Sequence, residues 1–392
     1  MDTLWIGNGR LVLPQRVLEN GSVLIEDGRI IEIGHPCPRN VQRADADGGY
    51  ILPGFIDLHV HGGGGADAMD ATVQALQTMA RTHAAHGTTA LVPTTMTCED
   101  ALLERVIDRF LEARSATVEG AQLLGLHLEG PFFAASSRGA QPVLRQRVPD
   151  KAMLERILRR AQGYILRWDA APELEQMELF AQVMKANGVV AAVAHTSATA
   201  EQTMRAFDWG FSHVTHFYNA MTTFHKVDGI VHAGVIEAAY LREDVTIELI
   251  GDGCHVPRES MLLANRIKGA DRICLITDAM RAAGTNASRS ILGPEKDGVP
   301  VVIRDNVAQL PDLSSYAGSI ATMDRVFRVA HLRYGIPVCE VSRMLSLVPA
   351  RLCGCAHRKG SLERGKDADI VVMSADGYVR DVYIGGRRFN AA

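Results

Sequence analysis

Short apolar segments alternate with amphipathic segments eight times through the middle of this 392-residue chain. The apolar segments are predicted to be buried strands, and the segments between them carry helical periodicity with glycine stop signals such as Gly87 and Gly188. Strict alternation favours a parallel sheet in an α/β fold, and eight repeats favour a closed (β/α)8 TIM barrel over an open doubly wound sheet. The expected strands cover residues 51–58, 89–94, 123–128, 164–168, 189–194, 213–216, 245–250 and 272–277. The expected helices cover residues 71–86, 99–114, 151–161, 175–187, 200–209, 233–241 and 258–268.

Both ends of the chain are β-rich. Residues 1–50 hold short apolar segments around a turn signal at Asp27-Gly28, and residues 360–392 return to a similar pattern. We therefore predict a small β-sandwich domain built from both termini, beside a barrel domain of residues 51–359. Three further elements are expected within the barrel domain, namely an inserted hairpin at 297–307 and late helices at 320–334 and 338–346.

The composition argues against several classes of partner. A formal charge of −4 with no clustered Lys/Arg stripe argues against nucleic acid. No apolar run approaches the roughly 18 residues of a membrane span, and the first residues lack the features of a secretory signal. Seven scattered cysteines without a pairing pattern are typical of reduced thiols, so a cytoplasmic protein is expected.

Two histidines, His59 and His61, lie at the end of the first expected strand. Residues i and i+2 of an extended chain project to the same side, so both imidazoles can face one ion. Imidazole is a common ligand of zinc and iron. An isolated His-x-His at a strand end is more often ordinary polar structure, so a metal site requires further ligands from other strands.

Further candidate ligands follow the ends of other strands. Glu129 follows the third strand, His195 the fifth, His216 the sixth and Asp278 the eighth. The C-terminal ends of barrel strands converge on one mouth, where such enzymes keep their active sites. We therefore predict a divalent transition-metal site, zinc or iron, with Asp278 as both a ligand and the general base that moves a proton. His213 is expected to face outward.

These motifs together resemble the amidohydrolase superfamily and, within it, the N-acetylglucosamine-6-phosphate deacetylase family. The resemblance implies a TIM barrel with a small β domain, a metal-activated water, a homodimer, and removal of acetate from an N-acetylated amino sugar phosphate. Because His59 and His61 are present, the chain resembles the members that hold two ions. Glu129 is the expected bridge, since the fourth strand has no lysine to serve as one. The motifs are Pro53-Gly54-Phe55-Ile56-Asp57-Leu58-His59-Val60-His61-Gly62, His127-Leu128-Glu129-Gly130-Pro131-Phe132, His216-Phe217-Tyr218-Asn219-Ala220-Met221, Thr277-Asp278-Ala279 and Ala317-Gly318-Ser319.

The resemblance also implies a set of sugar contacts, with two departures from the family pattern. Gln141 stands where many members have histidine, and Val227 stands where an arginine normally binds the substrate phosphate. Valine cannot replace a guanidinium, so either Lys226 or His225 supplies a positive charge or the substrate carries no phosphate. The implied sugar contacts are Ala140, Gln141, Asn219, Ala220, Asp252, His255, Ser315, Tyr316 and Ala317.

Three hypotheses therefore remain open. The first is hydrolysis of N-acetylglucosamine-6-phosphate, which Asn219-Ala220-Met221 and the missing strand-four lysine favour. The second keeps the barrel and the chemistry but acts on an unphosphorylated or different N-acetylhexosamine, or on another N-acyl compound. The third is a non-catalytic scaffold, against which the full set of ligands argues.

Overall fold

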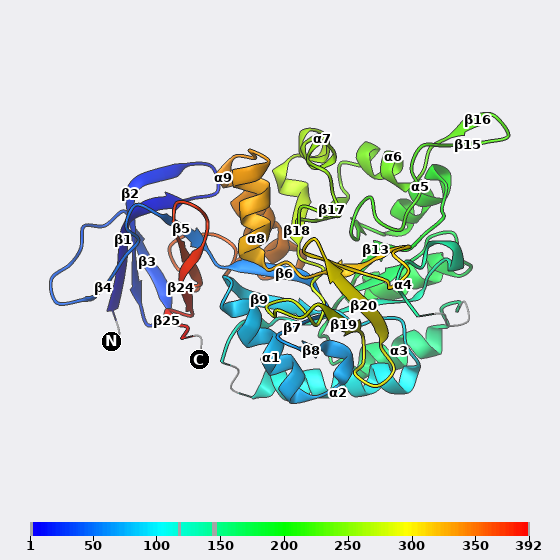
Figure 1. The fold of residues 1–392 in the computed structure, drawn as a ribbon, viewed down its shortest axis with the longest axis horizontal. Coiled ribbons are helices and arrows are strands. Elements are labelled where there is room, and N and C mark those ends of the chain that lie inside the picture. The colour runs from blue at the N-terminus through cyan, green and yellow to red at the C-terminus, as the bar shows by residue number, and fades with distance from the viewer. Residues whose placement is uncertain (1–2, 117–118, 143–146, 391–392) are drawn as a thin grey trace.

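The structure, a computed structural model, describes residues 3–116, 119–142 and 147–390. It is a mixed α/β fold in which a body of parallel strands and surrounding helices lies beside a β-sheet formed by both termini (Figure 1). No helix in these described ranges is long and apolar enough to cross a membrane.

The parallel strands form a three-stranded sheet and a six-stranded sheet. The first has the order β10-β9-β6, and the second runs β11-β12-β13-β14-β17-β18. All eight expected strands are present, and the third begins later than expected, so that Glu129 lies inside it instead of following it. The eight are β6 (Phe55–Val60), β9 (Thr88–Pro93), β11 (Leu126–Phe132), β12 (Ile165–Ala170), β13 (Val190–Val193), β14 (His213–Val214), β17 (Thr246–Ile250) and β18 (Ile273–Ile276). A ninth, short strand, β10 (Gln122–Leu123), pairs with β9.

Two isolated parallel bridges connect these sheets. Thr94, just after β9, pairs with His127 in β11, and Val60 in β6 pairs with Ala279, just after β18. The first bridge joins the three-stranded sheet to β11, at one edge of the six-stranded sheet. The second joins the three-stranded sheet to the chain just after β18, at the other edge. The carboxyl ends of the eight strands therefore lie close together in space.

Helices follow the strands as expected, and α1, α3 and α5 begin at side-chain caps. Thr199 caps the fifth helix in a reciprocal arrangement with Gln202, and Gly210 ends that helix in the left-handed conformation. Aromatic packing fixes the helices on the strands, as Phe180 on α4 lies with its ring centroid 5.8 Å from Phe132 and 6.0 Å from Trp168. The seven helices are α1 (Val73–Ala84), α2 (Asp100–Ser115), α3 (Lys151–Arg160), α4 (Met177–Ala186), α5 (Ala200–Trp209), α6 (Val235–Leu241) and α7 (Arg258–Lys268).

The late helices are also present, and each contains a π-helical stretch. They run as α8 (Met323–Phe327) into a π-helix (Arg328–Arg333), and as α9 (Val338–Ser342) through a second π-helix (Arg343–Leu347) into α10 (Val348–Leu352). Within the described residues, three single 3-10 turns complete the helical elements, at Ala68–Asp70, Ala135–Ser137 and Ala270–Arg272.

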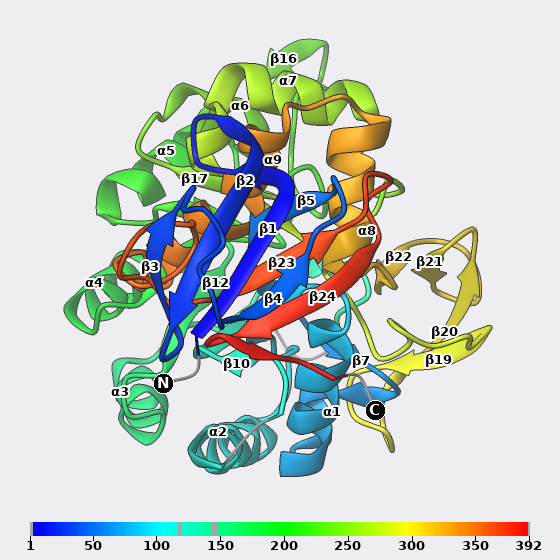
Figure 2. The ribbon, with the colours of Figure 1, turned by 90° about the vertical axis from the view of Figure 1, so that its left-hand side faces the viewer.

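The two termini share one eight-stranded sheet (Figure 2). Strand β23 pairs antiparallel with β5, so the last part of the chain lies against residues just before the first parallel strand, β6. Ile25 and Ile30 from one end of the sheet belong to the same buried cluster as Ile370 and Tyr383 from the other end, so the sheet curls over its own core. The strands are β1 (Thr3–Val12), β2 (Val17–Glu26), β3 (Arg29–Ile33), β4 (Gln42–Asp45), β5 (Tyr50–Pro53), β23 (Ile370–Met373), β24 (Val379–Ile384) and β25 (Arg387–Arg388).

Small antiparallel elements decorate the carboxyl ends of the parallel strands. The hairpin β15–β16 projects away from the body of the molecule (Figure 1). The expected hairpin at 297–307 is part of a larger four-stranded sheet, β19-β20-β21-β22. The elements are β7 (Gly62–Gly63), β8 (Ala66–Asp67), β15 (His225–Val227), β16 (Ile230–His232), β19 (Arg289–Leu292), β20 (Val299–Arg304), β21 (Val307–Gln309) and β22 (Tyr316–Ser319).

Candidate metal centre and active site

His59 and His61 lie where β6 ends, and their rings meet. Their Nε2 atoms are 3.3 Å apart, and His59 is fully buried. The backbone N–H of His61 donates to the carbonyl of Ala279 at 2.8 Å, which ties this strand end to the chain that follows β18. The extended chain directs both imidazoles to one point, as the spacing predicts.

Glu129, His195 and His216 form a second group. The Nε2 atoms of both histidines lie 3.1 Å from Glu129 Oε1 and 3.1 Å from each other. His195 and His216 follow β13 and β14 with φ angles of 44° and 30°. Few non-glycine residues adopt this left-handed backbone, and where they do it is commonly at functional sites. The bend at each strand end turns the imidazole toward Glu129.

Asp278 brings a second carboxylate to the first group. It follows β18, also with a positive φ of 50°, and its backbone N–H donates to the carbonyl of His59 at 3.0 Å. Its Oδ1 lies 3.4 Å from His59 Nε2 and 3.3 Å from His61 Nε2. A carboxylate oxygen therefore stands beside both imidazoles of this group.

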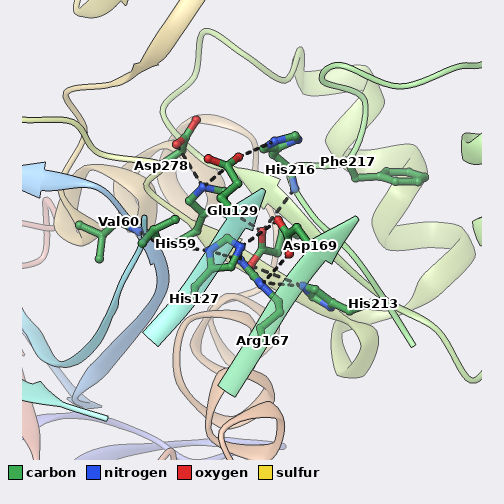
Figure 3. A network of polar contacts seen from close by, with 12 residues as sticks. His59, Val60, His127, Glu129, Arg167, Asp169, His213, His216, Phe217 and Asp278 are labelled. Carbon is green, nitrogen blue, oxygen red and sulfur yellow. Dashed lines mark hydrogen bonds and ion pairs between the residues drawn. The ribbon is translucent and has the colours of Figure 1, made fainter. Parts of the chain in front are cut away.

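Glu129 joins the two groups (Figure 3). Its Oε1 faces His195 and His216, whereas its Oε2 lies 3.3 Å from His61 Nε2. Ligand atoms about 2.0–2.1 Å from a tetrahedral ion are roughly 3.3 Å from one another, so spacings of 3.1 to 3.3 Å fit residues that share an ion. Two imidazoles on each side of one carboxylate are a donor set suited to two divalent transition ions.

The electrostatics of the centre favour bound positive charge. Burial would raise the pKa of Glu129, but hydrogen bonds from His195 and His216 hold that pKa well below its usual value. Burial would likewise lower the pKa of His61, but Asp278 and Glu129 raise that pKa to about 9. Burial also opposes ionisation of Asp278, yet His59 and His61 keep the pKa of Asp278 below its usual value. Asp278 is therefore a carboxylate at neutral pH and can accept a proton.

A pocket of about 160 Å³ opens above these ligands. His255 is oriented at its edge because its Nδ1 lies 2.8 Å from Asp252 Oδ2, which leaves Nε2 free to face a ligand. Tyr316 packs on the His255 ring with centroids 4.7 Å apart. Sequence-predicted residues that line the pocket are His61, Glu129, Ala140, Gln141, His195, His216, Asn219, Ala220, His255, Asp278, Ser315 and Tyr316. Gly318, part of the Ala317-Gly318-Ser319 motif, also lines the pocket, and the lining residues that the sequence did not single out are Met96, Gly139, Ile250 and Leu292.

Other predicted sugar contacts lie away from the pocket wall. Ala317 is buried beside Gly318, and Asp252 supports His255 from behind. His225 and Lys226 lie in the exposed hairpin β15–β16 and are not among the residues that line the pocket in the described part of this chain. The side chain of Val227, whose identity raised the question of phosphate binding, falls outside the described residues.

A buried charged network lies directly behind the ligands, and the sequence did not predict it. Arg167 on β12 donates to Glu248 on β17, to His213 Nε2 at 3.1 Å and to His127 Nδ1 at 2.7 Å. His127 Nε2 in turn lies 2.8 Å from Asp169. A charged residue in the middle of an apolar strand, such as Glu248, is the sequence signal that could have revealed this network.

The expectation that His213 faces outward is wrong. His213 is fully buried and points at Arg167 (Figure 3). The expectation assumed that residues 213–216 form one regular strand, but β14 ends at Val214 and His216 has a left-handed backbone. The strand alternation therefore stops before His216, and both histidines can project inward.

The chain belongs to the amidohydrolase family, whose model matches residues 50–389. It is 35% identical to the N-acetylglucosamine-6-phosphate deacetylase of Bacillus subtilis over 383 residues, which cover 96% of this chain and 94% of that protein. It is 33% identical to the N-acetylgalactosamine-6-phosphate deacetylase of Escherichia coli O157:H7 over 380 residues, with 96% and 97% of the two chains covered.

A solved structure extends this similarity to three dimensions. A variant of the Mycobacterium smegmatis N-acetyl-D-glucosamine-6-phosphate deacetylase in complex with N-acetyl-D-glucosamine-6-phosphate matches with a TM-score of 0.91 at 30% identity. The match covers 99% of this chain and 100% of that one.

Proposed function

We propose that this amidohydrolase removes the acetyl group of N-acetylglucosamine-6-phosphate to give glucosamine-6-phosphate and acetate. The observation that carries the proposal is the meeting of His59–His61 and His195–His216 on the two oxygens of Glu129, with Asp278 beside them at the floor of a pocket. A scaffold without activity would have no need of this complete set of buried ligands.

The reaction needs two proton movements, and Asp278 is positioned for both. As a carboxylate it takes a proton from the attacking water while that oxygen bonds to the acetamide carbon. The same proton then passes to the amide nitrogen, which leaves as the amine when the C–N bond breaks. His255, held by Asp252, is oriented to bind the sugar at the pocket edge.

The metal requirement follows from the donor set. His59, His61, Glu129, His195 and His216 would hold two divalent ions, zinc or iron, with Asp278 as a further ligand. When bound, such ions polarise the carbonyl and lower the pKa of water from about 15.7 toward ~7. Imidazole and carboxylate donors suit both metals.

The architecture that we propose is a closed (β/α)8 barrel of residues 51–359 with a β-sandwich domain of residues 1–50 and 360–392. The continuous parallel pairing through the bridges Thr94–His127 and Val60–Ala279 supports closure. The curled eight-stranded sheet supports the second domain, although β5 extends that sheet as far as Pro53. The metal site then lies at the mouth of the barrel.

We further propose a cytoplasmic homodimer. The hairpin β15–β16 and the residue before it expose apolar side chains, with Phe224 61% and Ile230 64% exposed, and a second copy of the chain would cover them. Such a hairpin could carry Lys226 to the pocket of the other protomer. All seven cysteines, each within the described residues, are unpaired, as expected in a reducing compartment.

The direct test is a deacetylation assay on purified, metal-loaded protein. N-Acetylglucosamine-6-phosphate should have the highest kcat/KM, and the assay should include the unphosphorylated sugar and N-acetylgalactosamine-6-phosphate. The galactosamine isomer is the second candidate substrate, because the E. coli relative that bears its name is nearly as similar as the B. subtilis one. Release of acetate from none of these sugars would refute the proposal.

A further inference from the structure

Glu248 is a buried carboxylate that reaches both halves of the metal centre. It lies on β17 and is fully inaccessible to solvent. Its Oε2 lies 3.2 Å from His59 Nδ1 and accepts the backbone N–H of His216 at 3.3 Å. Each contacted residue belongs to a different ligand group, so one side chain contacts both.

The contact with His59 determines which ring nitrogen can face an ion. A carboxylate accepts a hydrogen bond and cannot donate one, so Nδ1 of His59 carries the proton. Nε2 then presents its lone pair toward His61 and Asp278. A carboxylate behind a metal-ligating histidine fixes both the tautomer and the orientation of the ring.

The contact with His216 has less influence on the position of the His216 ring. It involves the backbone N–H, and the His216 ring is directed by its own left-handed backbone and by Glu129 Oε1 at 3.1 Å. Loss of Glu248 would leave those determinants in place. The two halves of the centre should therefore depend on Glu248 unequally.

Arg167 holds Glu248 from the opposite side. Its guanidinium donates to Glu248 Oε1 while also bonding His213 and His127, and it is itself buried. The hydrogen bond from Arg167 to Glu248 Oε1 leaves Oε2 to His59 and His216. The arrangement constrains the position of the carboxylate relative to the His59 ring.

We propose that Glu248 is a positioning residue that builds the His59–His61 half of the metal centre by fixing the His59 ring. The inference rests on the metal centre of the proposed function. It assigns no contact between Glu248 and substrate. If Glu248 served only as a structural ion-pair partner of Arg167 between β12 and β17, its replacement would instead lower stability and weaken metal binding in both halves alike.

The test is metal titration of the purified apo-protein with Zn²⁺ against a competing chelator. Wild type should bind two ions. Glu248→Gln, which keeps the shape of the side chain, should weaken one binding event by about 10–100-fold and leave the other unchanged. In a His61→Asn background, which already lacks this half, Glu248→Gln should have no further effect on the remaining ion.

The matched control is Asp324→Asn, which alters another buried carboxylate that accepts from Thr322 and Arg328. It should lower stability without changing either binding event. If Glu248→Gln does not fold, Glu248→Asp provides the same test, because the shorter side chain withdraws the carboxylate from His59.

The outcomes separate this inference from the proposed function. Two unchanged binding events in the Glu248 variant, or equal weakening of both, would overturn the inference while leaving the hydrolase intact. A wild type that binds a single ion would overturn it as well. A wild type that binds no transition metal would refute the metal-dependent function itself.

Discussion

Gln141 Nε2 donates to Glu129 Oε2 at 2.6 Å, while Gln141 Oε1 accepts the backbone N–H of Thr97 at 2.9 Å. The second bond fixes the orientation of the amide, because only oxygen can accept from Thr97. Gln141 therefore holds the oxygen of Glu129 that faces His61. This links a residue predicted as a sugar contact to the carboxylate at the centre of the proposed metal site.

Replacement of Gln141 should consequently disturb metal binding as well as substrate binding. We expect Gln141→Leu, which keeps the size but loses the donor, to lower metal affinity or kcat by about 10–100-fold. Metal titration and steady-state kinetics on the same preparation measure both effects. Gln182→Leu is the control, since Gln182 is an exposed residue on α4. A Gln141 variant whose metal affinity and kcat match the control would refute the role.

Removal of the proposed proton carrier should abolish most of the turnover. Asp278→Asn keeps the shape of the side chain but removes its basicity, so kcat should fall on the order of 10²–10⁴-fold. Bound metal should decline far less, because five other ligands remain. Kinetics and metal analysis should be run together, and near-native turnover in the variant would show that another group moves the proton.

Metal removal should inactivate the enzyme and destabilise it. Chelation followed by dialysis should abolish hydrolysis, and zinc or iron should restore it. The melting temperature of the apo-protein should be lower than that of the loaded protein, because ligands that bind only the folded state stabilise that state. Full activity in protein that elemental analysis finds free of metal would contradict the mechanism.

Lys226 should carry the preference for a phosphorylated sugar. A charge-assisted phosphate contact contributes roughly 1.5–3 kcal/mol, so Lys226→Ala should reduce the kcat/KM ratio of the 6-phosphate to the free sugar by about one to two decades. Lys185→Ala, a change on α4, controls for loss of surface charge. If wild type already accepts both sugars equally, Lys226 does not confer phosphate selectivity.

The buried His83 should make the fold sensitive to acid. Burial lowers the pKa of His83 to about 4 from 6.5, so between these values the unfolded chain binds a proton that the folded chain does not. Stability contributed by this difference is complete above pH 6.5 and falls by up to about 3 kcal/mol as pH drops to 4.

His83→Gln retains a donor for the carbonyl of Gly62, which His83 Nε2 contacts at 2.9 Å, and should flatten that dependence. Urea unfolding across the pH range compares the variant with wild type. His357→Gln changes an exposed histidine and should leave the slope unaltered. An identical slope in wild type and His83→Gln would show that His83 does not cause the acid sensitivity.

The strand and helix order was predictable because burial of parallel strands leaves apolar runs, and helices between them keep their periodicity. Helices 200–209 and 258–268 were predicted to the residue, since Gly210 and Gly269 mark their ends. The third strand was misplaced by several residues, because the sequence 122–132 holds a short strand, β10, followed by a separate one, β11.

The candidate ligands were predictable for a different reason. They lie near the carboxyl ends of parallel strands, and these ends lie close together in space. The network behind them was not, because its members lie within strands that read as apolar. Asp169 sits one residue beyond the expected end of its strand, and the pairing of Arg167 with Glu248 joins residues 81 positions apart. Position in the sequence gives no sign of such a contact.

Three residues of the centre, His195, His216 and Asp278, combine a proposed metal-binding role with a left-handed backbone. Among residues with a side chain, histidine, aspartate and asparagine tolerate that conformation best. The backbone and the ion therefore accept nearly the same small set of amino acids at these positions. Evolutionary loss of a ligand should pass through asparagine, which keeps the turn while weakening the metal bond. For the same reason, an alanine scan of this centre would confound backbone strain with ligand loss, and asparagine is the informative replacement.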